Sequence, residues 1–332
     1  MNFNSWQWRI CLNMLEYHLR LMHRSDLPAV NRILSKAFTA ARINDGFKTT
    51  HVPLCHLSFL EMYLAPFPAG CIIIEDEKGL VGYAFSRLWG EVAWIGPVSV
   101  IPGHQNKKLG QQLMVKVIEI LQRAGARVIG LETMPRSVHN IGFYTKLGFL
   151  PQNLTVDLIL PVPHHPEEPY PADYEVVSYN DADPAEKFFL ISAVEKLARC
   201  IDPHLSIRAE IEVTSQFNYG DTIFVQRGRE LLACFIAHTK TYSEDETPHF
   251  MKIVLTLMEA ALSVGEMLPH LFAFAAREKL NTISFRTPTR YSRAYSELIA
   301  AGFKVFHSDL RMTLEGYEEV ADQKSFYLSK WE

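Results

Sequence analysis

The chain has 332 residues, 48% hydrophobic and 21% charged, which is typical of soluble globular proteins and long enough for two domains. Its net charge of −4 gives no general attraction to nucleic acid or to an anionic membrane, and no stretch is apolar for long enough to span a bilayer. The five cysteines are scattered without a C-x-x-C pair, which argues against a disulfide framework and a zinc site. No signal peptide is predicted, and we expect a cytoplasmic protein.

The first domain is predicted over residues 15–160, behind a leader over residues 1–14. The elements expected in its first part are a strand and a helix within residues 17–38, a helical or loop segment over 51–63, a β-hairpin over 71–85 and a strand over 91–100. Gly96-Pro97 interrupts the last of these strands, and a bulge there would splay the sheet and open a slot.

A polar loop and a helix follow the strand that ends at Pro102-Gly103. The helix is predicted from Gly110, because apolar residues recur at every fourth position: Leu113, Val117 and Leu121. The loop therefore delivers backbone N–H groups to a helix N-terminus, where partial positive charge and unpaired donors suit a phosphate group. Lys107 and Lys108 add positive charge to this loop.

This segment resembles motif A of the GNAT acetyltransferases, in which V-x-P-x-x-[Q/R]-x-x-G-x-[G/A] holds the pyrophosphate of acetyl-CoA. Val100, Pro102, Gln105 and Gly110 match the pattern. Lys108 departs from it, because a glycine is usual at that position. If the backbone there needs a positive φ, a non-glycine residue costs roughly 1 kcal/mol, which an ammonium group near the diphosphate would offset.

A second motif follows a predicted strand over residues 127–132 and a break at Pro135. The next segment resembles motif B of the same family, N-x-x-A-x-x-[F]-Y-x-K-L-G-F. The matching residues are Phe143, Tyr144, Lys146, Leu147, Gly148 and Phe149. Ser137 stands at the usual asparagine position and Asn140 at the usual alanine position. Because the two motifs occur in the right order and are joined by a helix and a strand of the right length, the chain is identified as a member of the GNAT superfamily.

The resemblance implies that acetyl-CoA is the co-substrate, that an amine accepts the acetyl group and that no metal takes part. Backbone groups of three strand residues would pair with the pantetheine arm: Val98, Ser99 and Val100. The loop and the first helical turn would hold the diphosphate: Gln105, Asn106, Lys107, Lys108, Leu109, Gly110 and Gln111. Ser137 and Asn140 would hydrogen-bond CoA or cap the following helix. Tyr144 would lie near the sulfur and act as general acid, since a phenol with a pKa of about 10 suits donation to a thiolate.

The general base is left open at this point. Histone-acetylating members of the family carry a glutamate on the central strand, and the same register here holds Trp94, so that route is absent. Glu91 and Glu132 would flank the slot and draw a proton through water, or they are solvated charges at strand ends. We favour the second interpretation for Glu91 and name Glu132 as the candidate base.

Residues 161–172 are predicted to form a stiff, extended, proline-rich linker. His164-His165 within it is interpreted as part of a solvated loop and not as a metal site. A second domain is predicted over residues 173–332, because parts of the first domain recur there in order. The recurring parts are the opening strand and helix at 174–194, the hairpin at 221–238 and the closing segment at 287–306. We therefore expect an α/β fold of two tandem GNAT-like domains, each a mixed, splayed central sheet flanked by helices.

The second copy is predicted to have lost the chemistry. It has no glycine loop before its long helix, and Glu259 and Glu266 would repel phosphate. Leu298 stands where Tyr144 stands in the first copy. This degenerate domain is expected to pack against the first copy or to shape its acceptor cleft, and residual CoA binding is the less favoured alternative.

The predicted function is transfer of the acetyl group of acetyl-CoA directly to a primary amine, with a small amine or amino-sugar favoured over a protein acceptor. The alternative is a non-catalytic acyl-CoA-binding or regulatory protein on the same fold. Lys108 and the missing strand glutamate favour that alternative, whereas Tyr144 argues against it. No nucleic-acid or membrane partner is expected, and the oligomeric state is left open.

Overall fold

The computed structural model describes residues 16–163, 174–243, 249–259, 261–319 and 326–327. The predicted leader and most of the predicted linker, including His164-His165, lie outside the described residues. The boundaries of the two domains therefore stay predictions, although each half of the described chain carries the same order of elements.

The first half contains ten helices and strands within the described residues, separated by three short 3-10 turns. They are β1 (His18–Leu21), α1 (Leu27–Asn44), α2 (Leu57–Leu64), β2 (Ile72–Asp76), β3 (Gly79–Trp89), β4 (Val92–Val100), α3 (Leu109–Arg123), β5 (Val128–Thr133), α4 (Val138–Thr145) and β6 (Phe149–Pro161). The 3-10 turns span Arg24–Asp26, Pro68–Gly70 and Pro102–His104. α3 forms where its spacing predicts it, and it buries one apolar face against the sheet.

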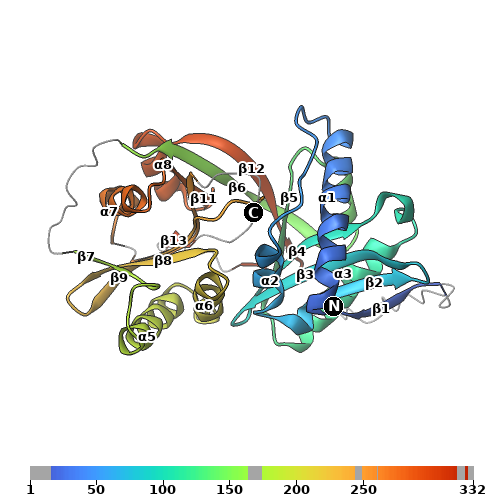
Figure 1. Ribbon diagram of the computed structural model, residues 1–332, viewed down its shortest axis with the longest axis horizontal. Coiled ribbons are helices and arrows are strands. Elements are labelled where there is room, and N and C mark those ends of the chain that lie inside the picture. The colour runs from blue at the N-terminus through green and yellow to red at the C-terminus, as the bar shows by residue number, and fades with distance from the viewer. Residues whose placement is uncertain (1–15, 164–173, 244–248, 260, 320–325, 328–332) are drawn as a thin grey trace.

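The second half repeats this order. Its elements are β7 (Glu175–Ser178), α5 (Pro184–Ile201), α6 (Arg208–Gln216), β8 (Gly220–Arg227), β9 (Glu230–His238), β10 (Phe250–Met258), α7 (Val264–Arg277), β11 (Thr282–Pro288), α8 (Ser292–Ala300) and β12 (Lys304–Leu314). A last short strand, β13 (Phe326–Tyr327), follows β12. The expectation of two tandem copies, each with a mixed sheet flanked by helices, is confirmed (Figure 1).

The two sheets are joined by an exchange of strands that the sequence does not predict. The strand order is β1-β2-β3-β4-β5-β12-β6-β11-β10-β9-β8-β7, with β13 added beside β10. β12 of the second copy thus lies between β5 and β6 of the first, and β6 lies between β12 and β11 of the second. Each copy therefore completes the sheet of the other, and the described strands form one continuous, curved sheet (Figure 1).

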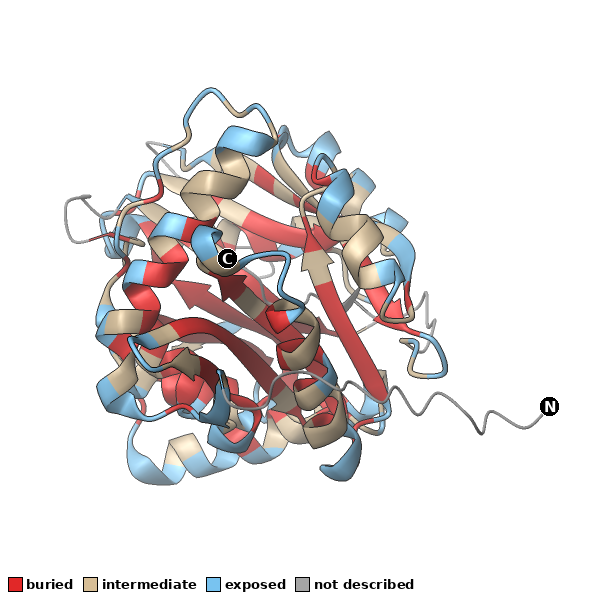
Figure 2. Cartoon of the chain, turned by 90° about the vertical axis from the view of Figure 1, so that its right-hand side faces the viewer, coloured by how far each residue is buried: buried red, intermediate tan, exposed pale blue. Residues whose placement is uncertain are grey.

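Side chains of β4 alternate between two hydrophobic cores. Ala93 and Ile95 pack on the α3 side, whereas Val92 and Trp94 point into a core shared with α5 and with strands of the second copy. Figure 2 shows the buried strands between helices whose outer faces are exposed. The second copy therefore packs against the face of the first-copy sheet that carries Trp94.

The predicted irregularity of β4 is present. The pairing of β3 with β4 shifts register opposite Gly96-Pro97, between Ala84 and Ser86. The parallel pairing of β4 with β5 runs from Val92↔Val128 to Trp94↔Gly130 and goes no further in the described strands. The two strands therefore separate beyond Trp94, where the bulge predicts a slot.

Candidate functional site

The loop before α3 presents an open helix N-terminus. Asn106 and Lys108 both have a left-handed backbone, with φ of 64° and 60°. Lys108 is the N-cap residue, and among the described residues no side chain caps this end of the helix. The first N–H groups of an α-helix have no acceptor within the helix, so those of the turn that begins at Leu109 are available to an anion. The structure thus bears out the positive φ that we considered for Lys108.

Side chains of the loop divide into those that hold its shape and those that face solvent. Gln105 Nε2 donates to the carbonyl oxygen of Val100 at 3.1 Å, which fastens the loop to β4. Lys107 Nζ donates to the hydroxyl of Tyr17 at 2.8 Å, and this hydrogen bond raises the pKa of the ammonium group. Lys108 is exposed. Two cations therefore flank the open N-terminus.

The strand residues predicted to meet the pantetheine arm lie beyond the point of divergence. Val98, Ser99 and Val100 pair with β3 along one edge, as in Tyr83↔Ser99. Their other edge faces the side from which β5 has diverged. Because β4 runs directly into the loop of α3, this unpaired edge and the open helix N-terminus are adjacent parts of one surface.

Helix α4 lies across the start of α3. A Cβ atom built on Gly110 would lie 3.5 Å from Cζ of Phe143, which is ordinary van der Waals contact. Ser137 occupies the N-cap position of α4 and is buried, yet its side chain makes no cap hydrogen bond. The capping role considered for Ser137 is therefore not found, whereas Asn140 is half-buried on the first turn of the helix.

Tyr144 is half-buried on α4 between two aromatic rings. Its ring centroid lies 5.2 Å from that of Phe143 and 6.2 Å from that of Phe149. Burial raises the pKa of the phenol to about 12, so the hydroxyl is a proton-bearing hydrogen-bond donor throughout the physiological range.

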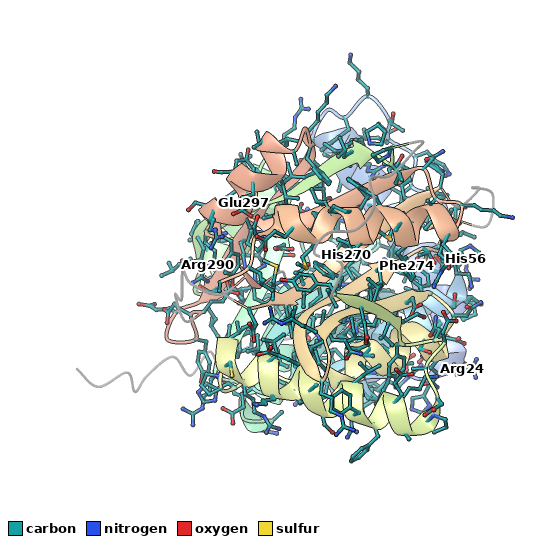
Figure 3. The ribbon with its side chains drawn as sticks, turned by 90° about the vertical axis from the view of Figure 1, so that its left-hand side faces the viewer. Arg24, His56, His270, Phe274, Arg290 and Glu297 are labelled. Atoms are coloured by element: carbon teal, nitrogen blue, oxygen red, sulfur yellow. The ribbon has the colours of Figure 1, made fainter. Side chains whose placement is uncertain are left out.

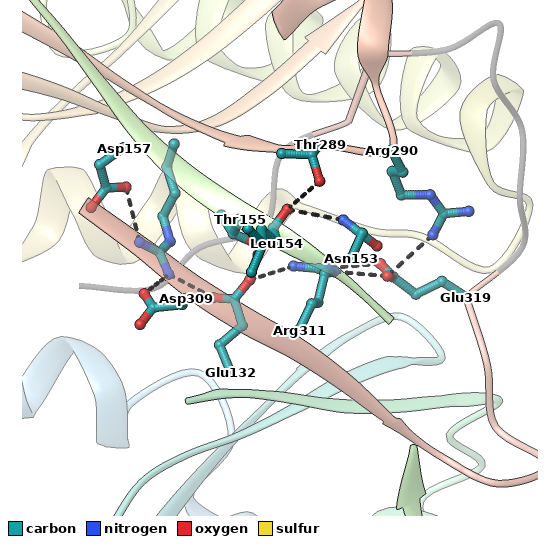
Figure 4. A network of polar contacts seen from close by, with 11 residues as sticks. Glu132, Asn153, Leu154, Thr155, Asp157, Thr289, Arg290, Asp309, Arg311 and Glu319 are labelled. Carbon is teal, nitrogen blue, oxygen red and sulfur yellow. Dashed lines mark hydrogen bonds and ion pairs between the residues drawn. The ribbon is translucent and has the colours of Figure 1, made fainter. Parts of the chain in front are cut away.

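Glu132 lies in a buried ionic network, which Figure 4 shows. Its Oε1 accepts from Arg311 Nη1 at 2.7 Å and from the hydroxyl of Thr155, and its Oε2 accepts from Arg286 Nη2 at 2.7 Å. Only 2% of the glutamate side chain is exposed. Both oxygens are thus already engaged by the guanidinium groups of β11 and β12, an arrangement that favours a bridging role for this carboxylate over proton removal.

The network extends across both copies. Arg286 also binds Asp157 at 2.9 Å and Asp309 at 2.7 Å, and Arg311 binds Glu319 at 2.6 Å. Burial opposes ionisation of Asp309, but the hydrogen bond from His307 and the charge of Arg286 lower the pKa of Asp309 to about 2. Sequence reasoning missed these contacts. The available signal was the presence of charged residues in the middle of otherwise apolar strands.

Trp94 lies on β4, and Glu91 lies just before this strand. The guanidinium of Arg311 lies 4.0 Å from the centre of the Trp94 ring, so a stacked pair fills the position where the family's strand glutamate is usual. Glu91 precedes β4 and binds Arg127 at 2.5 Å and His204 at 2.8 Å. It is therefore a partly exposed charge at a strand end, far along the strand from the slot.

Among the residues that the structure describes, no group of three or more His, Cys, Asp or Glu side chains could hold a metal ion. No helix in the described ranges is both long and apolar enough to cross a membrane.

The model of the acetyltransferase (GNAT) family matches residues 28–149, which include the loop, α3 and all of α4. No curated protein sequence matches the chain.

Several solved structures share the fold over most of the chain. A provisionally assigned acetyltransferase from Pyrococcus horikoshii has a TM-score of 0.65 at 17% identity, covering 96% of this chain and 96% of its own. A GCN5-related N-acetyltransferase from Sphaerobacter thermophilus has a TM-score of 0.59 at 13% identity, covering 92% and 98%. A tandem GNAT protein from the clavulanic acid biosynthesis pathway has a TM-score of 0.58 at 11% identity, covering 92% and 100%. The first copy therefore carries a GNAT acetyltransferase domain, in a chain with a tandem-like architecture of two copies.

Proposed function

We propose that the chain transfers the acetyl group of acetyl-CoA to a primary amine, and that the first copy binds the CoA. The observation that carries this proposal is the uncapped N-terminus of α3 beside the unpaired edge of β4. The diphosphate would accept hydrogen bonds from the first-turn N–H groups and draw further stabilisation from Lys107 and Lys108. The pantetheine arm would pair with Val98–Val100 and carry the thioester into the slot.

The proposed reaction is a direct transfer that forms no covalent intermediate with the protein. The neutral amine nitrogen forms a bond to the thioester carbonyl carbon, the carbon–sulfur bond breaks, and the amine loses one proton while the sulfur gains one. Since a free thiol has a pKa of about 8.5, a phenol with a pKa of about 12 is the weaker acid. We therefore assign Tyr144 the role of donating a hydrogen bond to the thiolate as charge develops on sulfur.

A small acceptor suits the packing better than a protein. The second copy covers the face of β4 that carries Trp94, so the acceptor would reach the slot past the other copy. One protein of the same fold is described as a glucosamine N-acetyltransferase region of a fungal multi-domain enzyme, with a TM-score of 0.59 at 14% identity. We accordingly favour a small amine or an amino-sugar. A cytoplasmic location accords with the buried thiols of Cys71 and Cys234, which form no disulfide.

Calorimetric titration with acetyl-CoA tests the binding part of the proposal. The variants are Gly110→Glu, which adds a carboxylate at the open helix N-terminus, and Gly110→Gln, which adds a neutral side chain of the same size. A side chain is accommodated there, since the nearest atom to a built Cβ lies at ordinary contact distance. We expect binding in the wild type and in the glutamine variant and its loss in the glutamate variant. Equal binding by both variants would refute the assignment of the diphosphate to α3.

The alternative is a non-catalytic acyl-CoA-binding protein, which the Trp94–Arg311 stack at the usual glutamate position favours. Tyr144→Phe separates the two functions. A catalyst loses turnover with an amine acceptor while its CoA affinity stays, and a binding module shows no turnover in either form. Glu132→Gln, compared at equal folded fraction, tests whether this carboxylate takes part in proton removal.

A further inference from the structure

The second copy contains counterparts of the strand edge and of the helix N-terminus that form the proposed CoA site. Val92 begins the parallel pairing of β4 with β5, and Phe250 begins that of β10 with β11. Counted from these two residues, Leu257 and Met258 of β10 stand at the places of Ser99 and Val100. Both strands also carry a register shift just after the parallel pairs. The edge of β10 at Leu257 and Met258 therefore corresponds to the edge of β4 that is proposed to bind the pantetheine arm.

That edge is occupied by the chain itself. Strand β13 pairs antiparallel with β10 through Leu257↔Tyr327 and Met258↔Phe326. An extended backbone therefore hydrogen-bonds the same residues of the second copy that would hold the pantetheine amides in the first. Polypeptide and pantetheine both present amide groups along an extended chain, so one edge suits either.

The counterpart of the diphosphate position is also filled. At the N-terminus of α7, Ser263 and Glu266 form a capping box, and Glu297 Oε2 accepts from Val264 N at 2.9 Å and from the hydroxyl of Ser263 at 2.8 Å. Figure 3 shows Glu297 near this end of α7. A carboxylate thus sits where α3 leaves its N–H groups open.

This carboxylate belongs to Glu297 of α8, the helix that corresponds to α4 of the first copy. Counted back from Gly148-Phe149 and from Gly302-Phe303, Glu297 of α8 is the counterpart of Phe143 of α4. Phe143 packs beside Gly110 and leaves the N–H groups of α3 open, whereas Glu297 caps those of α7. Arg293 Nε donates to Glu297 at 2.8 Å, so a cation also lies at this end of α7.

We propose that the second copy retains a groove of the CoA type and that the chain closes it with β13 on the pantetheine edge and Glu297 on the phosphate position. This inference rests on the proposed function for the way CoA lies in the first copy. It predicts one CoA site per chain in the wild type. It also predicts that the second site opens only when both internal groups are removed.

The experiment uses the full-length chain with the first site disabled by Gly110→Glu. Phe326→Pro together with Tyr327→Pro removes the N–H donors of β13, and Glu297→Ala removes the carboxylate that accepts from Val264 N at the start of α7. Phe326→Val with Tyr327→Val is the matched control, since valine keeps a strand backbone. Coenzyme A binding is measured by calorimetry, and amide hydrogen exchange is followed over residues 250–258.

We expect CoA binding to return only in the variant that carries both the proline pair and Glu297→Ala. Exchange over 250–258 should rise with the proline pair and stay unchanged with the valine pair. Two CoA sites in the wild type, no change in exchange, or no CoA binding by the doubly opened variant would each overturn the proposal. The exchange result does not involve the first copy, so failure of the proposed function and failure of this inference are distinguishable.

Discussion

Lys108 places a lysine in a left-handed backbone conformation at the start of α3, with φ of 60° and ψ of 12°. For an L-residue this conformation costs roughly 1 kcal/mol more than for glycine. We compare Lys108→Gly with Lys108→Ala, because both remove the same exposed charge and only glycine relieves the backbone. The glycine variant should be more stable than the alanine variant by about 1 kcal/mol in the free energy of unfolding, measured by denaturant titration.

Affinity for acetyl-CoA should change differently from stability. Both Lys108 variants lose one cation near the proposed diphosphate position, so both should bind acetyl-CoA about two- to fivefold more weakly at low salt, with the difference shrinking as salt is added. Equal stability of the two variants would refute the backbone argument. Unchanged affinity at low salt would refute the position assigned to the diphosphate.

The remaining predictions concern the shared sheet. Arg311→Met should destabilise the protein by about 3–5 kcal/mol, because it removes a buried cation that binds both Glu132 and Glu319. Arg208→Met, at an exposed helical pair, should cost less than about 1 kcal/mol, and urea unfolding compares the two variants. The lowered pKa of Asp309 contributes about 2 kcal/mol to the free energy of unfolding. This contribution is present above pH 3.8, the ordinary pKa of an aspartate, and is lost as the pH falls towards about 2. The acid side of the stability–pH profile should therefore be flatter in Asp309→Asn. Gly130→Ala should unfold the first copy, because a Cβ there would overlap the ring of Trp94, and Gly130→Ala combined with Trp94→Leu should recover folding as seen by circular dichroism.

The site was predictable to the extent that it is local in sequence. A strand, a turn and a helix start that follow one another within a few residues need no distant partner, so the positions of Val100, Gln105 and Gly110 imply their arrangement. The glycine that the motif usually has at position 108 raised the question of a positive φ, and Lys108 adopts one. The role of Glu132 was not accessible in this way, because its two arginine partners come from the second copy.

The sequence by itself determined that the chain holds two copies of a splayed α/β fold and that the first copy keeps both GNAT motifs. Only the tertiary structure decided that β6 and β12 are exchanged and that β13 covers β10. Strand edges pair through backbone N–H and C=O groups, which every residue except proline presents alike, so the order of strands from distant parts of a chain leaves little trace in its local pattern. The buried charges of Arg286 and Arg311 show the same limit, since each is stable in the core only because carboxylates from the exchanged strands lie beside it.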